Sequence, residues 1–101
     1  MLHVTTTCPD LESARRLARA ALEARLAACA NIIPGLVILF HWQGRVEEEA
    51  EVMLVFKTTA QRHADLLALI ESLHPYDLPV ITCETVETTP AAAEWLRTET
   101  G

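Results

Sequence analysis

Apolar and polar positions recur with a regular period along most of the chain. Residues 2–8 are rich in valine and threonine and predict a short strand. We expect a helix from Asp10 to about residue 28, because apolar positions recur there every three or four residues and aspartate suits the N-cap. Cys29 falls on the core-facing stripe of this helix.

The middle of the chain predicts a long hairpin. Residues 36–42 are mostly apolar or aromatic, and residues 45–57 divide by alternation between two faces of a second strand. Residues 43–44 form a candidate two-residue turn, and residues 34–35, a Pro-Gly pair, mark a turn or a strand bend. Arms of this length should carry the tip, near Trp42, beyond a small domain, where it is suited to an interface.

The last part of the chain predicts two helices and a strand. A helix over residues 60–73 ends at His74, because the residue before a proline avoids helical backbone. A strand follows over residues 80–86, and a short helix runs from 90 to 98. This βαββαβ order indicates an α+β, ferredoxin-like sandwich with both long helices on one face of an antiparallel sheet. One copy offers nothing to cover the other face, which favours an oligomer.

The composition of the chain excludes several classes of protein and partner. The 101 residues indicate a single domain, 1–101, and half of them are hydrophobic, a surplus that also favours a subunit interface. A net charge of −6 disfavours nucleic acid as a partner. Three cysteines without a Cys-x-x-Cys pair argue against a disulfide framework, and we expect Cys83 to be buried in its strand. With no signal-peptide pattern and no bilayer-spanning run, we expect a cytoplasmic protein with no membrane partner.

Several motifs resemble, in the same order, the CutA family of divalent-cation tolerance proteins. They are Leu26–Gly35 (LAACANIIPG), Trp42–Glu48 (WQGRVEE), Glu51–Val52, Lys57–Thr59 (KTT) and His74–Tyr76 (HPY). The similarity extends from Val4 to Trp95, nearly the whole chain. It implies a homotrimer of ferredoxin-like subunits, an association with copper and other divalent cations, and no established enzymatic activity.

Candidate metal ligands cluster around the His-Pro-Tyr motif. Imidazole binds copper, so His74 is the first candidate, and Cys8 at the end of the first strand is the second. Where the resemblance implies a glutamate after this loop, the chain has Val80, and Glu84 is a substitute about 13 Å further along a strand. We expect Cu(II) or another divalent metal as the ligand, none being obligatory. The structural alternatives are a helix-terminal histidine and, for Cys8, a small buried hydrophobe.

The chain departs from the family once more, with Ala92 where tyrosine is common three residues before the final tryptophan. From the resemblance and the topology, four further residues are predicted to line a polar cleft between subunits. They are Trp42, Glu51, Lys57 and Tyr76. Glu51 also belongs to an acidic stretch that suits a solvated strand edge, and Lys57 is the only lysine.

Two other functions remain open from the sequence. One is a trimeric signalling protein of the PII type, which binds a small ligand in clefts between subunits. The other is an acylphosphatase-like enzyme, but the segment after the first strand has no arginine to hold a phosphate. The chain has three glycines and no Gly-x-Ser-x-Gly motif, so we expect no enzymatic activity.

Overall fold

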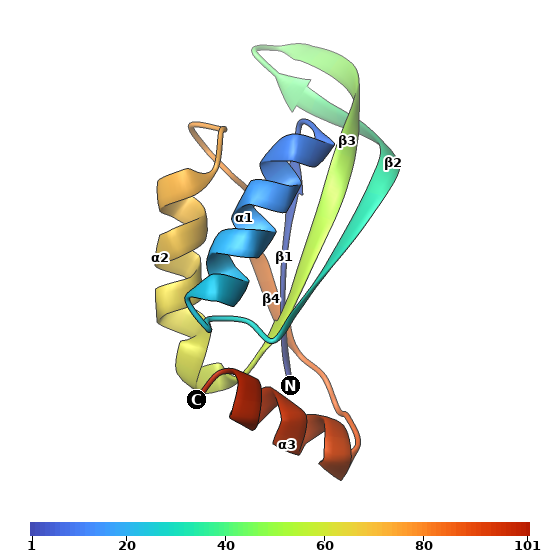
Figure 1. The fold of residues 1–101 in the computed structure, drawn as a ribbon. Helices are drawn as coiled ribbons and strands as arrows, with labels where there is room; N and C mark the ends of the chain where they lie inside the picture. Colours follow the sequence, from blue (N-terminus) through green and yellow to red (C-terminus); the bar gives the residue numbers. More distant parts are fainter.

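A computed structural model describes residues 1–101. The elements in chain order are β1 (Leu2–Cys8), α1 (Leu11–Glu23), β2 (Cys29–Trp42), β3 (Arg45–Thr58), a 3₁₀ turn (Ala60–Arg62), α2 (His63–Leu73), β4 (Thr82–Thr85) and α3 (Pro90–Glu99). The strands form one antiparallel sheet in the order β2-β3-β1-β4. Figure 1 shows α1 and α2 on the same face of this sheet, which confirms the predicted α+β, ferredoxin-like fold. We call the face without these helices the open face.

Helix α1 ends earlier than the sequence predicts. Arg25 has a φ of +57°, and the backbone N–H of Leu26 donates to the carbonyl of Ala21 at 2.9 Å, which closes the helix. Cys29 is therefore not a helical residue. It opens β2 and is half-buried, so its predicted place on the helical stripe was wrong.

The predicted hairpin is confirmed and is longer than expected. Gln43 and Gly44 both have positive φ values, +51° and +78°, as the favoured two-residue turn requires. The first arm starts at Cys29 and continues through an irregularity between Ile33 and Leu36, where the Pro-Gly pair interrupts the pairing. The hairpin tip projects past the helices, and the subunit measures 45 × 24 × 21 Å (Figure 1).

The core lies between the sheet and the two long helices. Its largest fully buried side chains include Leu17, Leu54, Phe56, Leu66 and Ile70. Only 19 of the 101 residues are buried, although half of the chain is hydrophobic. Large apolar side chains remain exposed along the hairpin, namely Ile33, Val37, Leu39, Trp42 and Val46. A single copy therefore leaves much of its apolar surface in water.

The last strand is shorter than predicted and lies at the edge of the sheet. Of the predicted residues 80–86, only Thr82–Thr85 pair with β1. Cys83 is exposed and Val80 is 72% exposed, so the expected burial of Cys83 was wrong. At the sheet edge His63, the first residue of α2, approaches the Cys83 thiol to 3.2 Å. None of the helices is both long and apolar enough to cross a membrane.

Candidate functional site

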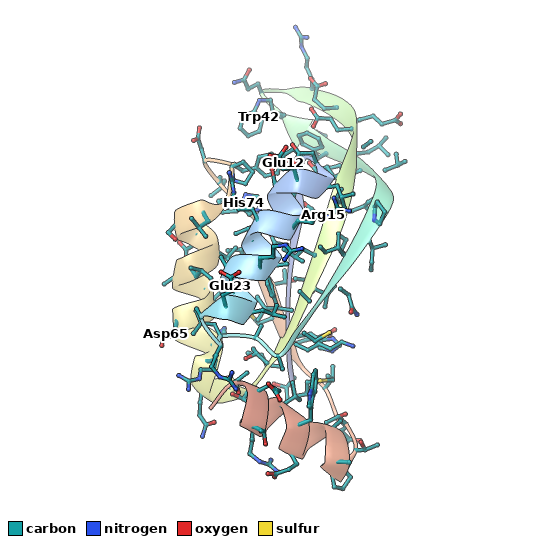
Figure 2. All side chains as sticks on the ribbon, viewed as in Figure 1. Glu12, Arg15, Glu23, Trp42, Asp65 and His74 are labelled. Carbon is teal, nitrogen blue, oxygen red and sulfur yellow. The ribbon has the colours of Figure 1, made fainter.

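The site is built around His74, which is buried at the end of α2 (Figure 2). Its Nδ1 accepts a hydrogen bond from the backbone N–H of Tyr76 at 3.1 Å. The proton of the neutral ring therefore sits on Nε2, which lies 2.9 Å from the carbonyl oxygen of Thr7 and donates to it. Two backbone groups thus fix both the orientation and the tautomer of the imidazole.

These contacts favour the neutral form of His74. Burial lowers its pKa below the ordinary value, against smaller opposing effects of the Thr7 carbonyl and the charge of Glu51. A second ring proton would face the Tyr76 N–H, which is itself a donor. A neutral imidazole is the form that binds metals, but both nitrogens of His74 already have partners. A metal ion at His74 must therefore displace one of these hydrogen bonds.

Thr6 belongs to the same network and was not among the predicted site residues. Its hydroxyl donates to the carbonyl of Val80 at 2.9 Å and lies 3.2 Å from Nε2 of His74, from which it accepts. Every second residue of β1 points into the core, and Thr6 is the one hydroxyl in that buried row. A polar residue at an inward position was the signal that could have identified it.

Glu51 is the most unusual residue of the site. It is only 5% exposed, and its Oε2 accepts a hydrogen bond from the Tyr76 hydroxyl at 2.5 Å. Its second oxygen, Oε1, is buried and has no hydrogen-bond partner. Burial, and next the hydrogen bond to Glu51, raise the pKa of Tyr76 above its ordinary value. The phenol therefore keeps its proton, and one carboxylate oxygen remains free to accept a cation or a donor.

Cys8 lies at the end of β1 and is fully buried in the hydrophobic core. Burial raises the pKa of its thiol to about 11, and the charges of Asp10 and Glu51 act in the same direction. The thiol is therefore protonated at neutral pH. This environment matches the structural alternative of a small buried hydrophobe better than that of a preformed metal ligand.

Glu84 is not brought to His74. It lies on β4 opposite His3, whereas His74 contacts Thr6 and Thr7 near the other end of β1. Three or four residues of strand correspond to about 10–13 Å. The acid that the structure does place near His74 is Glu51, through Tyr76.

The predicted cleft residues also fall into separate regions of one copy. Lys57 pairs with His3 and Cys29 and is six residues from Glu51 on β3, a distance of about 20 Å along the strand. Trp42 lies opposite Arg45 at the hairpin tip, well away from the Lys57 end of the sheet (Figure 2). Within one subunit, only three of the named residues meet, namely Glu51, His74 and Tyr76.

A single subunit does not offer a complete metal shell. No three histidine, cysteine, aspartate or glutamate side chains lie together in an arrangement that could hold a metal ion. The rings of His74 and Tyr76 are 5.0 Å apart, and the phenol links the histidine loop to the acid on β3. A cation at this site would need water or a second copy to complete its coordination.

Changing Tyr76 to phenylalanine is expected to destabilise the protein by about 1.5–3 kcal/mol, because it leaves a buried carboxylate without its donor. In a Glu51→Gln background, the same change should cost only about 1 kcal/mol, since the hydrogen bond is then between neutral groups. Urea unfolding of the four proteins at one concentration measures both values. Equal costs in the two backgrounds would contradict a charged Tyr76–Glu51 pair.

Comparison with known proteins gives a consistent result. The family described as CutA1 divalent ion tolerance protein matches residues 2–99. The divalent-cation tolerance protein CutA of Thermus thermophilus is 41% identical over 99 residues, which are 97% of this chain and 96% of that protein. The same signature motifs noted in the sequence lie within these matched residues.

Solved structures agree with the sequence comparison. A divalent cation tolerance protein (CutA1) from Thermus thermophilus has a TM-score of 0.93 and 42% identity, with 100% of both chains covered. A structure described as the periplasmic divalent cation tolerance protein CutA from Archaeoglobus fulgidus has a TM-score of 0.95 and 29% identity, again over 100% of both chains. The sequence match, its extent and the shared fold together show that this chain belongs to the CutA1 family of divalent ion tolerance proteins.

Proposed function

We propose that this protein acts in divalent-cation tolerance as a homotrimer that binds Cu(II), or another divalent metal, at the site formed by Glu51, Tyr76 and His74. The family is named for divalent-cation tolerance, which supports a role in the response to metal ions. The buried, unpartnered Oε1 of Glu51 is the observation that carries direct binding. A buried carboxylate oxygen without a partner is costly, and a cation would compensate for that cost.

Three features of the subunit support assembly. The hairpin carries exposed apolar side chains, with Val37, Leu39 and Val46 each more than 60% exposed. The open face of the sheet has no helix packed on it (Figure 1). The edge strands β2 and β4 both lack an outer partner, and unpaired edges are templates for pairing with another copy. Head-to-tail contacts of this kind form a closed ring when the rotation between copies permits it.

The geometry of the site supports a shared metal shell. One subunit provides a carboxylate oxygen and a neutral imidazole, but no third ligand in reach. In a trimer, residues that lie far apart within one copy, such as Trp42 and Lys57, would be able to approach Glu51 from a neighbour. Cys8 and Glu84 are the weaker ligand candidates, since the first keeps its proton and the second lies on the far part of β4.

A charge-removing substitution tests this site. Glu51→Gln keeps the size of the side chain and an acceptor for Tyr76, yet it should lower the affinity for Cu(II) by about tenfold or more. Glu49→Gln is the matched control, because Glu49 is exposed on the same strand, two residues away. Calorimetric titration of the wild type and both variants at neutral pH measures the effect. An equal loss of Cu(II) affinity in the two variants would contradict a specific site at Glu51. It would show that copper is attracted only by the summed negative charge of the strand.

The proposed role is non-enzymatic. Cys8 follows the Thr6 and Thr7 contacts of His74 on β1, but its thiol is protonated and is not among the hydrogen-bond partners of His74. We also propose a cytoplasmic location, since all three cysteines are free, as is usual in a reducing compartment. The relative described as periplasmic makes fractionation of tagged cells the informative test.

A further inference from the structure

A second pair of metal-ligating side chains lies at the other end of α2 from the His74 loop, at the first residue of the helix. Nε2 of His63 is 3.2 Å from Sγ of Cys83 on β4. Cys83 is exposed and His63 is half-buried, so the pair is open to water in a single copy. The two side chains come from a helix and a paired strand, which hold their relative positions.

We propose that His63 and Cys83 form a bidentate surface site for a thiophilic divalent cation of the Zn(II) type. Zinc bonds of about 2.3 Å to sulfur and 2.0–2.1 Å to nitrogen place the two ligands about 3.5 Å apart in a tetrahedral site. The observed separation of 3.2 Å is close to that value, and the exposed thiol has room to make the small adjustment. The ligand pair is therefore nearly preorganised.

Binding exchanges a proton for a metal ion. The Cys83 S–H bond breaks and its proton goes to solvent, while a metal–sulfur bond and a metal–nitrogen bond to His63 form. No electron is transferred. Water fills the remaining positions, because no third histidine, cysteine or acidic ligand lies within reach.

This site is separate from the one proposed at Glu51. Cys83 pairs with Val4 in the sheet, whereas the His74 network contacts Thr6 and Thr7. An open, two-ligand site would exchange its metal readily, which suits a protein that meets a changing supply of cations. The two sites are therefore tested independently. A negative copper titration at Glu51 would leave the His63–Cys83 proposal standing, and a negative result at His63–Cys83 would leave the Glu51 proposal standing.

Protection of the thiol from alkylation tests the site residue by residue. The full-length protein is freed of metal with a chelator and then treated with iodoacetamide, with and without Zn(II), and peptide mass spectrometry follows each cysteine. We expect zinc to slow the modification of Cys83 by about tenfold or more and to leave Cys29 nearly unaffected. Cys29 is the internal control, since its thiol donates to the Asn31 side chain and forms no hydrogen bond with an imidazole.

His63→Gln should remove this protection, and His74→Ala should retain it. The wild-type comparison with and without zinc needs no variant, so it stands even if a substitution disturbs the start of α2. Equal rates for Cys83 with and without zinc would overturn the proposal. Full protection in His63→Gln would also overturn it, because the thiol would then bind the metal alone.

Discussion

Trp42→Ala is expected to weaken the trimer by about 2 kcal/mol, or about 30-fold in its dissociation constant. Trp42 is 56% exposed in the isolated subunit and lies at the tip of a hairpin that projects beyond the helices (Figure 1). More than half of this large aromatic residue is therefore left in water by its own copy. Native mass spectrometry over a dilution series measures the loss of a species with three times the subunit mass of 11.2 kDa.

Trp95→Ala is the matched control for this experiment. Trp95 is 46% exposed on α3, at the end of the subunit opposite the hairpin tip (Figure 1). The same chemical change there should leave the dissociation constant nearly unchanged. A wild type that is monomeric at all concentrations would contradict the assembly, and equal effects of the two substitutions would contradict the anchoring role of Trp42.

His74→Ala is expected to lower the affinity for Cu(II) by about tenfold or more. The neutral imidazole of the wild type is a copper ligand once one of its two hydrogen bonds is displaced. The wild type should bind Cu(II) more tightly than Ni(II) or Zn(II), as expected for a site with nitrogen ligands. His41→Ala is the control, because His41 is exposed on the hairpin and has no contact with this network. Unchanged copper affinity in His74→Ala would remove His74 from the site.

The pH dependence of this binding follows from the direction of the His74 pKa. Burial lowers that pKa below its ordinary value of about 6.5, so the ring is neutral at pH 7. Copper affinity through His74 should hold as pH falls to about 6.5 and decline only when pH passes through the lowered pKa. The same shift makes the folded state more stable above pH 6.5, and part of that stability is lost as the ring becomes protonated in acid. Copper titrations of the wild type and of His74→Ala at two pH values separate the contribution of His74 to the pH dependence of copper binding.

Local signals made most of the fold predictable. Asp10 accepts a hydrogen bond from the N–H of Ser13 at 2.7 Å and starts α1 as predicted, and Pro90 starts α3. The end of α1 was not predictable in the same way. The left-handed residue that stops it is Arg25, where a glycine would have been the usual signal, and the alanines that follow favour a helix.

The residues of the site were predictable from the sequence, but the hydrogen bonds between them were not. The motifs singled out Glu51, His74 and Tyr76, yet the hydrogen bond between Glu51 and Tyr76 spans 25 positions and depends on how far β3 runs past β1. Cys83 was misjudged because hydrophobic neighbours suggested a buried strand, whereas the position of β4 at the sheet edge leaves it exposed. Such tertiary placement has no counterpart in local sequence pattern.

A crystal structure of the protein soaked with Cu(II) is the decisive test of a copper site in a trimer. Anomalous scattering from copper locates the ion without reference to any assumed ligand. We expect three copies around a common axis, with copper bound at Oε1 of Glu51 and at a ring nitrogen of His74. Copper found only at other residues, with Oε1 of Glu51 still unpartnered, would contradict this expectation.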